Sequence, residues 1–109
     1  MTSAADVRAL AMALPEVEEA PHFESASFRV RGKILATLGA ETCTLKLPRE
    51  IQESLCQSDP GAIDLPAHWG QYGWTTITLA RFDAERLADL IAVSWRQVAP
   101  KALLEGRAA

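Results

Sequence analysis

Four basic residues fall close enough together in the first half of the chain to hold phosphate oxygens; they are Arg29, Arg31, Lys33 and Lys46. Three of them surround Gly32, at the tip of a predicted β-hairpin, and such a basic hairpin can act as a wing on duplex DNA. Hydroxyl groups are predicted on the same sheet face, from Thr44, Thr76 and Thr78. The alternative is a solvated face whose charges keep the protein soluble. The net charge of −3 favours that alternative.

A second group of residues suits stacking rather than charge. Two of the three tryptophans and the only tyrosine lie within the six residues Trp69–Trp74, together with two glycines. Trp and Tyr combine a large apolar body with a polar group, so this segment could stack on a base, a planar ligand or a partner side chain. The alternative is that the loop folds back and its aromatic rings close the end of the core. We expect core packing for Trp74, which begins a strand, and a binding role for Trp69 and Tyr72.

The histidines and cysteines form no recognisable metal or catalytic motif. His22 lies in an acidic loop and His68 directly precedes the aromatic segment, but their spacing matches no metal site. Cys43 and Cys56 form no CxxC pair, and in a reducing compartment we expect both to be small core residues. The sequence also lacks GxSxG, a glycine-rich phosphate loop and HExxH. We therefore predict no metal, no cofactor and no known catalytic activity, and we keep His22 as a candidate for the ligand or partner surface.

Length and composition indicate one globular domain over residues 1–109. The content of 49% hydrophobic and 23% charged residues is ordinary for a soluble protein. No apolar run approaches 18 residues, so no membrane span is expected, and the N-terminus does not resemble a secretory signal. The expected location is the cytoplasm.

Apolar residues recur at helical spacing in three segments; these are Ser3–Leu14, Arg49–Gln57 and the stretch from Asp83 to Pro100. Ser3 and Asp83 are predicted N-caps. Pro15 and Pro100 are predicted to end the first and last helices. Beyond them, residues 101–109 are expected to be a frayed tail.

Alternating apolar and polar residues predict strands over Ser27–Arg31, Lys33–Leu38, Thr42–Leu47 and Trp74–Ala80, with an extended piece near Ile63–Leu65. The alternation places Arg29, Arg31 and Lys46 on one solvent face. The acidic segment Glu16–Ser25 is predicted to be a loop. The expected fold is a two-layer α+β domain: an antiparallel sheet of four or five strands with three helices mainly on one face. Its predicted core contains Phe28, Val30, Ile34, Leu45, Ile77, Leu79, Leu87, Ile91 and Trp95.

Three segments, read in order, carry a resemblance to a known family; they are Leu14–Phe23, Ser27–Ala36 and Trp69–Trp74, followed by Ala99, Pro100 and Lys101. Their order and spacing over residues 5–101 resemble the MmcQ/YjbR-like proteins. The resemblance implies a CyaY-like fold and a "double wing" arrangement that has been likened to DNA-binding modules. It implies no established activity and supplies no catalytic residues, and DNA binding on this basis is an analogy between folds.

Two functions therefore remain open, with an enzyme of unfamiliar site as a third. One is a DNA-binding module that uses the four basic residues; so few cations predict weak, strongly salt-dependent binding to duplex DNA. The other is a module that binds a small ligand or a protein through the aromatic segment and His22. A contiguous positive face would support DNA, whereas a mixed face with an apolar, Trp-lined pocket would support a ligand or a protein.

Overall fold

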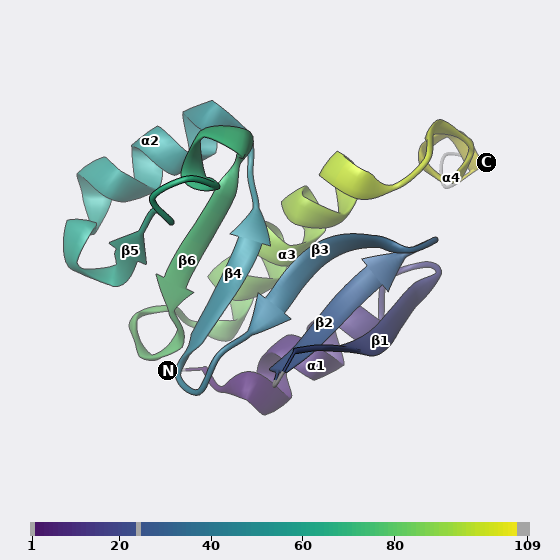
Figure 1. The fold of residues 1–109 in the computed structure, drawn as a ribbon, viewed down its shortest axis with the longest axis horizontal. Coiled ribbons are helices and arrows are strands. Elements are labelled where there is room, and N and C mark those ends of the chain that lie inside the picture. Colours follow the sequence, from purple (N-terminus) through teal and green to yellow (C-terminus); the bar gives the residue numbers. More distant parts are fainter. Residues whose placement is uncertain (1, 24, 107–109) are drawn as a thin grey trace.

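Six antiparallel strands form one sheet, and the helices pack mainly against one of its faces (Figure 1). The structure is a computed structural model that describes residues 2–23 and 25–106. The strand order is β1-β2-β3-β4-β6-β5, so β1 and β5 are the two edges. In chain order the elements are α1 (Ala4–Met12), β1 (Val17–His22), β2 (Ser25–Val30), β3 (Lys33–Leu38), β4 (Thr42–Lys46), α2 (Arg49–Ser58), η1 (Pro60–Ala62), β5 (Ile63–Asp64), η2 (Gly70–Tyr72), β6 (Trp74–Thr78), η3 (Leu79–Arg81), α3 (Ala84–Val98) and α4 (Lys101–Gly106).

Helices α1 and α3 cover one face of the sheet and lie behind it in Figure 1. The apolar stripe predicted for α3 is confirmed, since all of its members are buried: Leu87, Leu90, Ile91, Trp95 and Val98. The predicted cap is also present, because the Arg86 N–H donates to Asp83 Oδ1 at 2.8 Å. The opposite face of the sheet carries no such helical cover in this view.

Trp95 ties α3 to the turn between α1 and β1. Its side chain is only 1% exposed. The indole Nε1–H donates to the Pro15 carbonyl oxygen at 3.0 Å. At the other end of α1, the Ser3 N–H donates to Asp6 Oδ2 at 2.8 Å, which confirms the predicted N-terminal cap.

A buried serine of α3 completes the hydrogen bonding between β3 and β4 where their regular pairing stops. That pairing runs as far as Ala36 and Leu45. Beyond it, the Lys46 N–H donates to Ser94 Oγ at 3.1 Å, and the same hydroxyl donates to the Leu35 carbonyl oxygen at 2.6 Å. The hydroxyl thus satisfies two backbone groups that the strands do not satisfy themselves.

The segment Glu16–Ser25, predicted to be a loop, instead contains the edge strand β1. This strand pairs with β2 along its whole length, from Val17 to His22. Proline is tolerated in edge strands, so Pro21 does not break the pairing. The sheet therefore has six strands rather than four or five.

Two further predictions need correction. The sequence predicts a frayed tail after Pro100, but the chain there forms α4; residues 107–109 lie outside the described residues. Eight of the nine expected core residues are buried, whereas Ile34 is half-buried because it lies on the uncovered face of the sheet. None of the described helices is long and apolar enough to span a membrane.

Replacing Trp95 by alanine tests the core assignment. We expect Trp95→Ala to lower the free energy of unfolding by about 3–5 kcal/mol, because it leaves a large cavity and an unpaired Pro15 carbonyl. Urea denaturation followed by circular dichroism measures this loss. Trp69→Ala, at a 57% exposed tryptophan, is the control and should change stability by less than about 1 kcal/mol. Similar losses in the two variants would contradict the assignment.

Candidate binding groove

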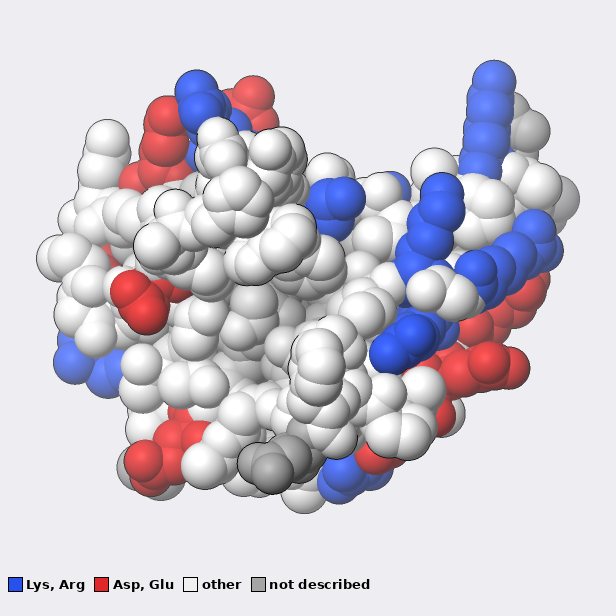
Figure 2. Space-filling view, viewed as in Figure 1, with Lys and Arg blue, Asp and Glu red and all other residues white. Residues whose placement is uncertain are grey.

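The uncovered face of the sheet is hollowed between its two ends. The hollow has a volume of about 410 Å³. It is lined by His22, Phe23, Ile34, Thr37, Thr44, Pro66, Trp69 and Trp74. We call it the groove. Figure 2 shows this face, where the left and centre are mostly uncharged and several Lys and Arg side chains gather over the right half.

Two threonines that line the floor of the groove, Thr37 and Thr44, belong to a row of threonines that continues to Thr76 beside the groove. The sheet register aligns Thr37 of β3, Thr44 of β4 and Thr76 of β6. The hydroxyls of Thr44 and Thr76 are 2.8 Å apart and share a hydrogen bond. Ile34 and Trp74 add half-buried apolar surface, so the floor combines hydroxyl groups with apolar area.

The rims come from two segments far apart in the sequence. One rim is the end of the β1–β2 hairpin, with His22 and Phe23, whose rings lie 4.8 Å apart edge to face. Phe23 is 94% exposed and has a φ of +56°. The other rim is the loop before η2, where Trp69 is 57% exposed. Both rims therefore present aromatic rings to solvent.

A buried glutamine of α2 holds the Trp69–Trp74 segment in place. The Gln52 side-chain amide donates to the Gly70 carbonyl oxygen at 3.1 Å and to Thr75 Oγ1 at 2.8 Å. The Thr75 hydroxyl in turn donates to the Gly73 carbonyl oxygen at 3.1 Å. Nothing in the sequence marks Gln52, because it is one of several polar residues in a short amphipathic helix.

Gly73 is required where the loop joins β6. Its φ is +102°, and a Cβ atom there would lie 2.7 Å from the Leu47 carbonyl oxygen. The Leu47 N–H donates to the Gly73 carbonyl oxygen at 2.8 Å. A side chain at this position would meet backbone in a conformation that non-glycine residues disfavour.

The three candidate aromatic residues occupy different positions. Trp69 and Trp74 line the groove, but Tyr72 is absent from its lining and is 57% exposed. The Tyr72 ring lies 6.0 Å from that of His68, which in turn lies 4.9 Å from the ring of Trp69. The sequence predicts that Trp74 packs in the core. The structure instead places it half-buried on the uncovered face of the sheet.

The four candidate cations do not share one face. The register places Arg29 and Lys46 on the uncovered face, opposite Ile34 and Trp74 respectively. Lys33 pairs with the buried Val30, so it belongs to the helix-covered side. The structure therefore divides the group between the two sides of the sheet.

The prediction that Arg31 lies beside Arg29 and Lys46 is wrong. Arg31 belongs to the β2–β3 turn, where Arg31 and Gly32 both have positive φ, as in a type I′ hairpin turn. Its guanidinium donates to both carboxylate oxygens of Glu16, at 3.0 and 3.1 Å. This hydrogen bonding lowers the pKa of the Glu16 carboxyl.

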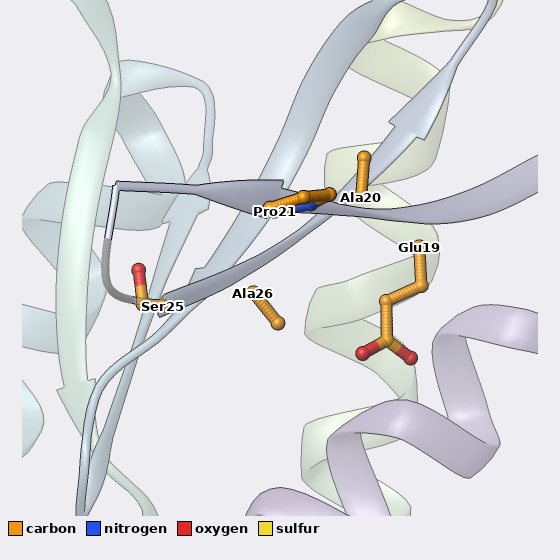
Figure 3. Close-up of a pocket in the computed structure, with 5 residues that line it drawn as sticks. All are labelled: Glu19, Ala20, Pro21, Ser25 and Ala26. Carbon is orange, nitrogen blue, oxygen red and sulfur yellow. The ribbon is translucent and has the colours of Figure 1, made fainter.

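A second hollow, of about 430 Å³, lies along the outer part of the β1–β2 hairpin (Figure 3). Its lining consists of Glu19, Ala20, Pro21, Ser25 and Ala26. The Glu19 carboxylate points toward α1 in the figure. There it accepts from Arg8 Nε at 2.8 Å and from Nη2 at 3.1 Å, which lowers the pKa of Glu19. Because its one ionisable side chain is already paired, this hollow offers little to a ligand.

Within residues 2–23 and 25–106, no three potential metal ligands of the His, Cys, Asp or Glu type come together. Cys43 is buried as predicted, and burial raises the pKa of its thiol to about 12. Cys56 is only partly buried. Neither cysteine is among the residues that line the groove.

Comparisons with known proteins agree with this fold. Residues 12–97 match the YjbR family model. The crystal structure of the Deinococcus radiodurans protein DR2400, with the family-model domain DUF419, superposes with a TM-score of 0.81 at 26% sequence identity. The match covers 94% of this chain and 82% of that chain. No curated protein matches the sequence. These findings confirm the resemblance and the α+β fold predicted from the sequence.

Removing the Gln52 amide tests how the loop is held. We expect Gln52→Ala to lower the free energy of unfolding by about 1–3 kcal/mol, because it removes two buried hydrogen bonds. The variant should also shift the NMR signals of the Trp69 and Trp74 indoles. Gln57→Ala, at an exposed position of the same helix, is the matched control. If both variants leave the indole signals unchanged, Gln52 does not position the loop.

The two cysteines should differ in reactivity. At about pH 8 a thiol reagent attacks only an accessible thiolate, so we expect the native protein to react at Cys56 and not at Cys43. Unfolding in guanidinium should expose both. Ellman's reagent measures the two rates, and Cys56→Ser isolates Cys43. Rapid labelling of native Cys56→Ser would contradict the burial of Cys43.

Proposed function

The chain belongs to the YjbR family, and we propose that it is a binding domain that takes up a flat aromatic small molecule in the groove. The observation that carries the proposal is the position of Trp69 and Trp74. Both line one hollow that lies over a floor of hydroxyl and apolar groups. Each tryptophan offers a face on which a planar ring can stack.

The size and chemistry of the groove suit a small molecule. Ligand pockets usually measure about 300–1,000 Å³ and combine apolar or aromatic walls with a few polar groups. The groove, at about 410 Å³, lies in this range. Stacking of a base on an aromatic side chain contributes about 1–3 kcal/mol. The Thr37 and Thr44 hydroxyls and the His22 ring then supply directional hydrogen bonds.

The same geometry gives less support to duplex DNA as the ligand. Of the four cations proposed for that role, only Arg29 and Lys46 lie on the uncovered face. Arg31 is paired with Glu16, and Lys33 is on the other side of the sheet. Two cations would release few counterions, so their contribution to duplex binding is small.

An NMR titration with adenosine tests the proposal. We expect chemical-shift changes at groove residues, and Trp69→Ala should weaken binding about 5- to 100-fold through the loss of one stacking surface. Tyr72→Ala is the matched control, because Tyr72 is equally exposed but lies outside the groove lining. It should change the dissociation constant less than about twofold.

Two results would overturn the proposal. One is the absence of shifts in the groove at millimolar adenosine. The other is an equal loss of binding in the Trp69 and Tyr72 variants. A parallel titration with a short DNA duplex completes the experiment: salt-sensitive shifts centred on Arg29 and Lys46, with none from adenosine, would favour the DNA-binding module instead.

A further inference from the structure

We propose that the ligand is an aromatic anion, whose ring stacks in the groove and whose phosphate or carboxylate is held by Lys46 with help from Arg29. This inference rests on the proposed function and adds the charge of the ligand to it. Its support comes from the position of these two cations on the sheet and the groups that each of them contacts.

Both cations border the same end of the groove. Lys46, at the end of β4, lies opposite Trp74, at the start of β6. Arg29, in β2, lies opposite Ile34 near the start of β3. Because the strands are antiparallel, the end of β4 adjoins the starts of both β3 and β6. A ring stacked on Trp74 would therefore place a substituent at this end within reach of a cation.

The described acidic residues that the register places on the uncovered face lie on the edge strands, and one of them, Glu18, is directly opposite Arg29. Glu18 belongs to β1 and Asp64 to β5. Lys46 and Arg29 are on inner strands. Of the two cations, Lys46 is the one that has no acidic residue opposite it in the β4–β6 pairing, since it pairs with Trp74, and it therefore supplies the main attraction for an anion.

Lys46 is a cation without a charged partner among the described residues. Its ammonium lies 6.0 Å from the centre of the Trp74 ring, and the side chain is half-buried. The three ion pairs of the described chain use other cations: Arg8, Arg31 and Arg81. A partly desolvated ammonium attracts an anion more strongly than a fully hydrated one, so a ligand anion would complete this site.

Arg29 is held in position by neutral groups. Its Nε–H donates to Ser27 Oγ at 2.9 Å and its Nη2 donates to the Pro21 carbonyl oxygen at 3.2 Å. Neither acceptor neutralises the guanidinium. The side chain therefore keeps its charge while its orientation is fixed, which reduces the entropy lost when it contacts an anion.

Paired ligands that differ only in charge provide the test. We expect adenosine 5′-monophosphate to bind about tenfold more tightly than adenosine, the size of one charge-assisted hydrogen bond. A second pair, 2-naphthoate and 2-naphthalenemethanol, shows whether a carboxylate is accepted as well as a phosphate. Dissociation constants come from NMR titrations at low salt, and added salt should reduce the preference.

Two charge-neutralising variants locate the effect. Lys46→Gln should remove most of the preference for the anion, measured within the variant as the ratio of the dissociation constants for adenosine and its monophosphate. Lys33→Gln makes the same change of net charge on the other side of the sheet and should preserve the preference. Circular dichroism establishes that both variants are folded.

The outcomes separate this inference from the proposed function. If neither adenosine nor the monophosphate shifts groove residues, the proposed function fails. If adenosine binds but each anion binds no more tightly than its neutral partner, only the inference about charge is overturned. It is also overturned if Lys33→Gln reduces the preference as much as Lys46→Gln does, since the attraction would then come from overall charge.

Discussion

The packing of α3 against one face of the sheet determines which side chains remain available for binding. This helix buries an apolar stripe along its 15 residues, and full burial of one such side chain stabilises the fold by about 1.5–3 kcal/mol. Side chains alternate along each strand, so the residues that do not face α3 must face away from it. Thr37, Thr44 and Trp74 lie on the uncovered face for this reason. Ser94 of the same helix contributes to this packing, because its hydroxyl forms hydrogen bonds with the backbone of both β3 and β4 beside Lys46.

Most of the fold could be predicted from periodicity because most elements bury one face. The stripe of α3, the β2–β3 hairpin around Gly32 and the alternation in β4 all produce regular patterns in the sequence. The edge strand β1 does not. Val17 is its only buried residue, and it carries two glutamates and Pro21. As an edge strand it pairs with β2 alone, and most of its side chains are exposed or half-buried, so the sequence gives little sign of a strand.

The site could be predicted in part. The aromatic segment was recognisable by its composition, and the groove includes Trp69 and Trp74. Phe23 and Thr37 were missed, because their place depends on the order of strands and on the length of the β1–β2 hairpin. Thr37 carried a usable signal, since it alternates with buried residues as Thr44 does. Strand alternation does not predict the position of Arg31, because this residue lies in a turn, where positive φ redirects the side chain.

The conformation of the groove rims argues that their exposure has a role. An exposed aromatic ring would be more stable if the loop folded inward and buried it. The structure instead fixes the loop through Gln52 and through Gly73, whose conformation suits few other residues. On the other rim, Phe23 is almost fully exposed with a positive φ, and strained backbone of this kind persists where the surrounding structure imposes it. Two aromatic rims held apart over a mostly uncharged floor form a surface that a planar ligand could cover, whereas a duplex would require positive charge across the whole face.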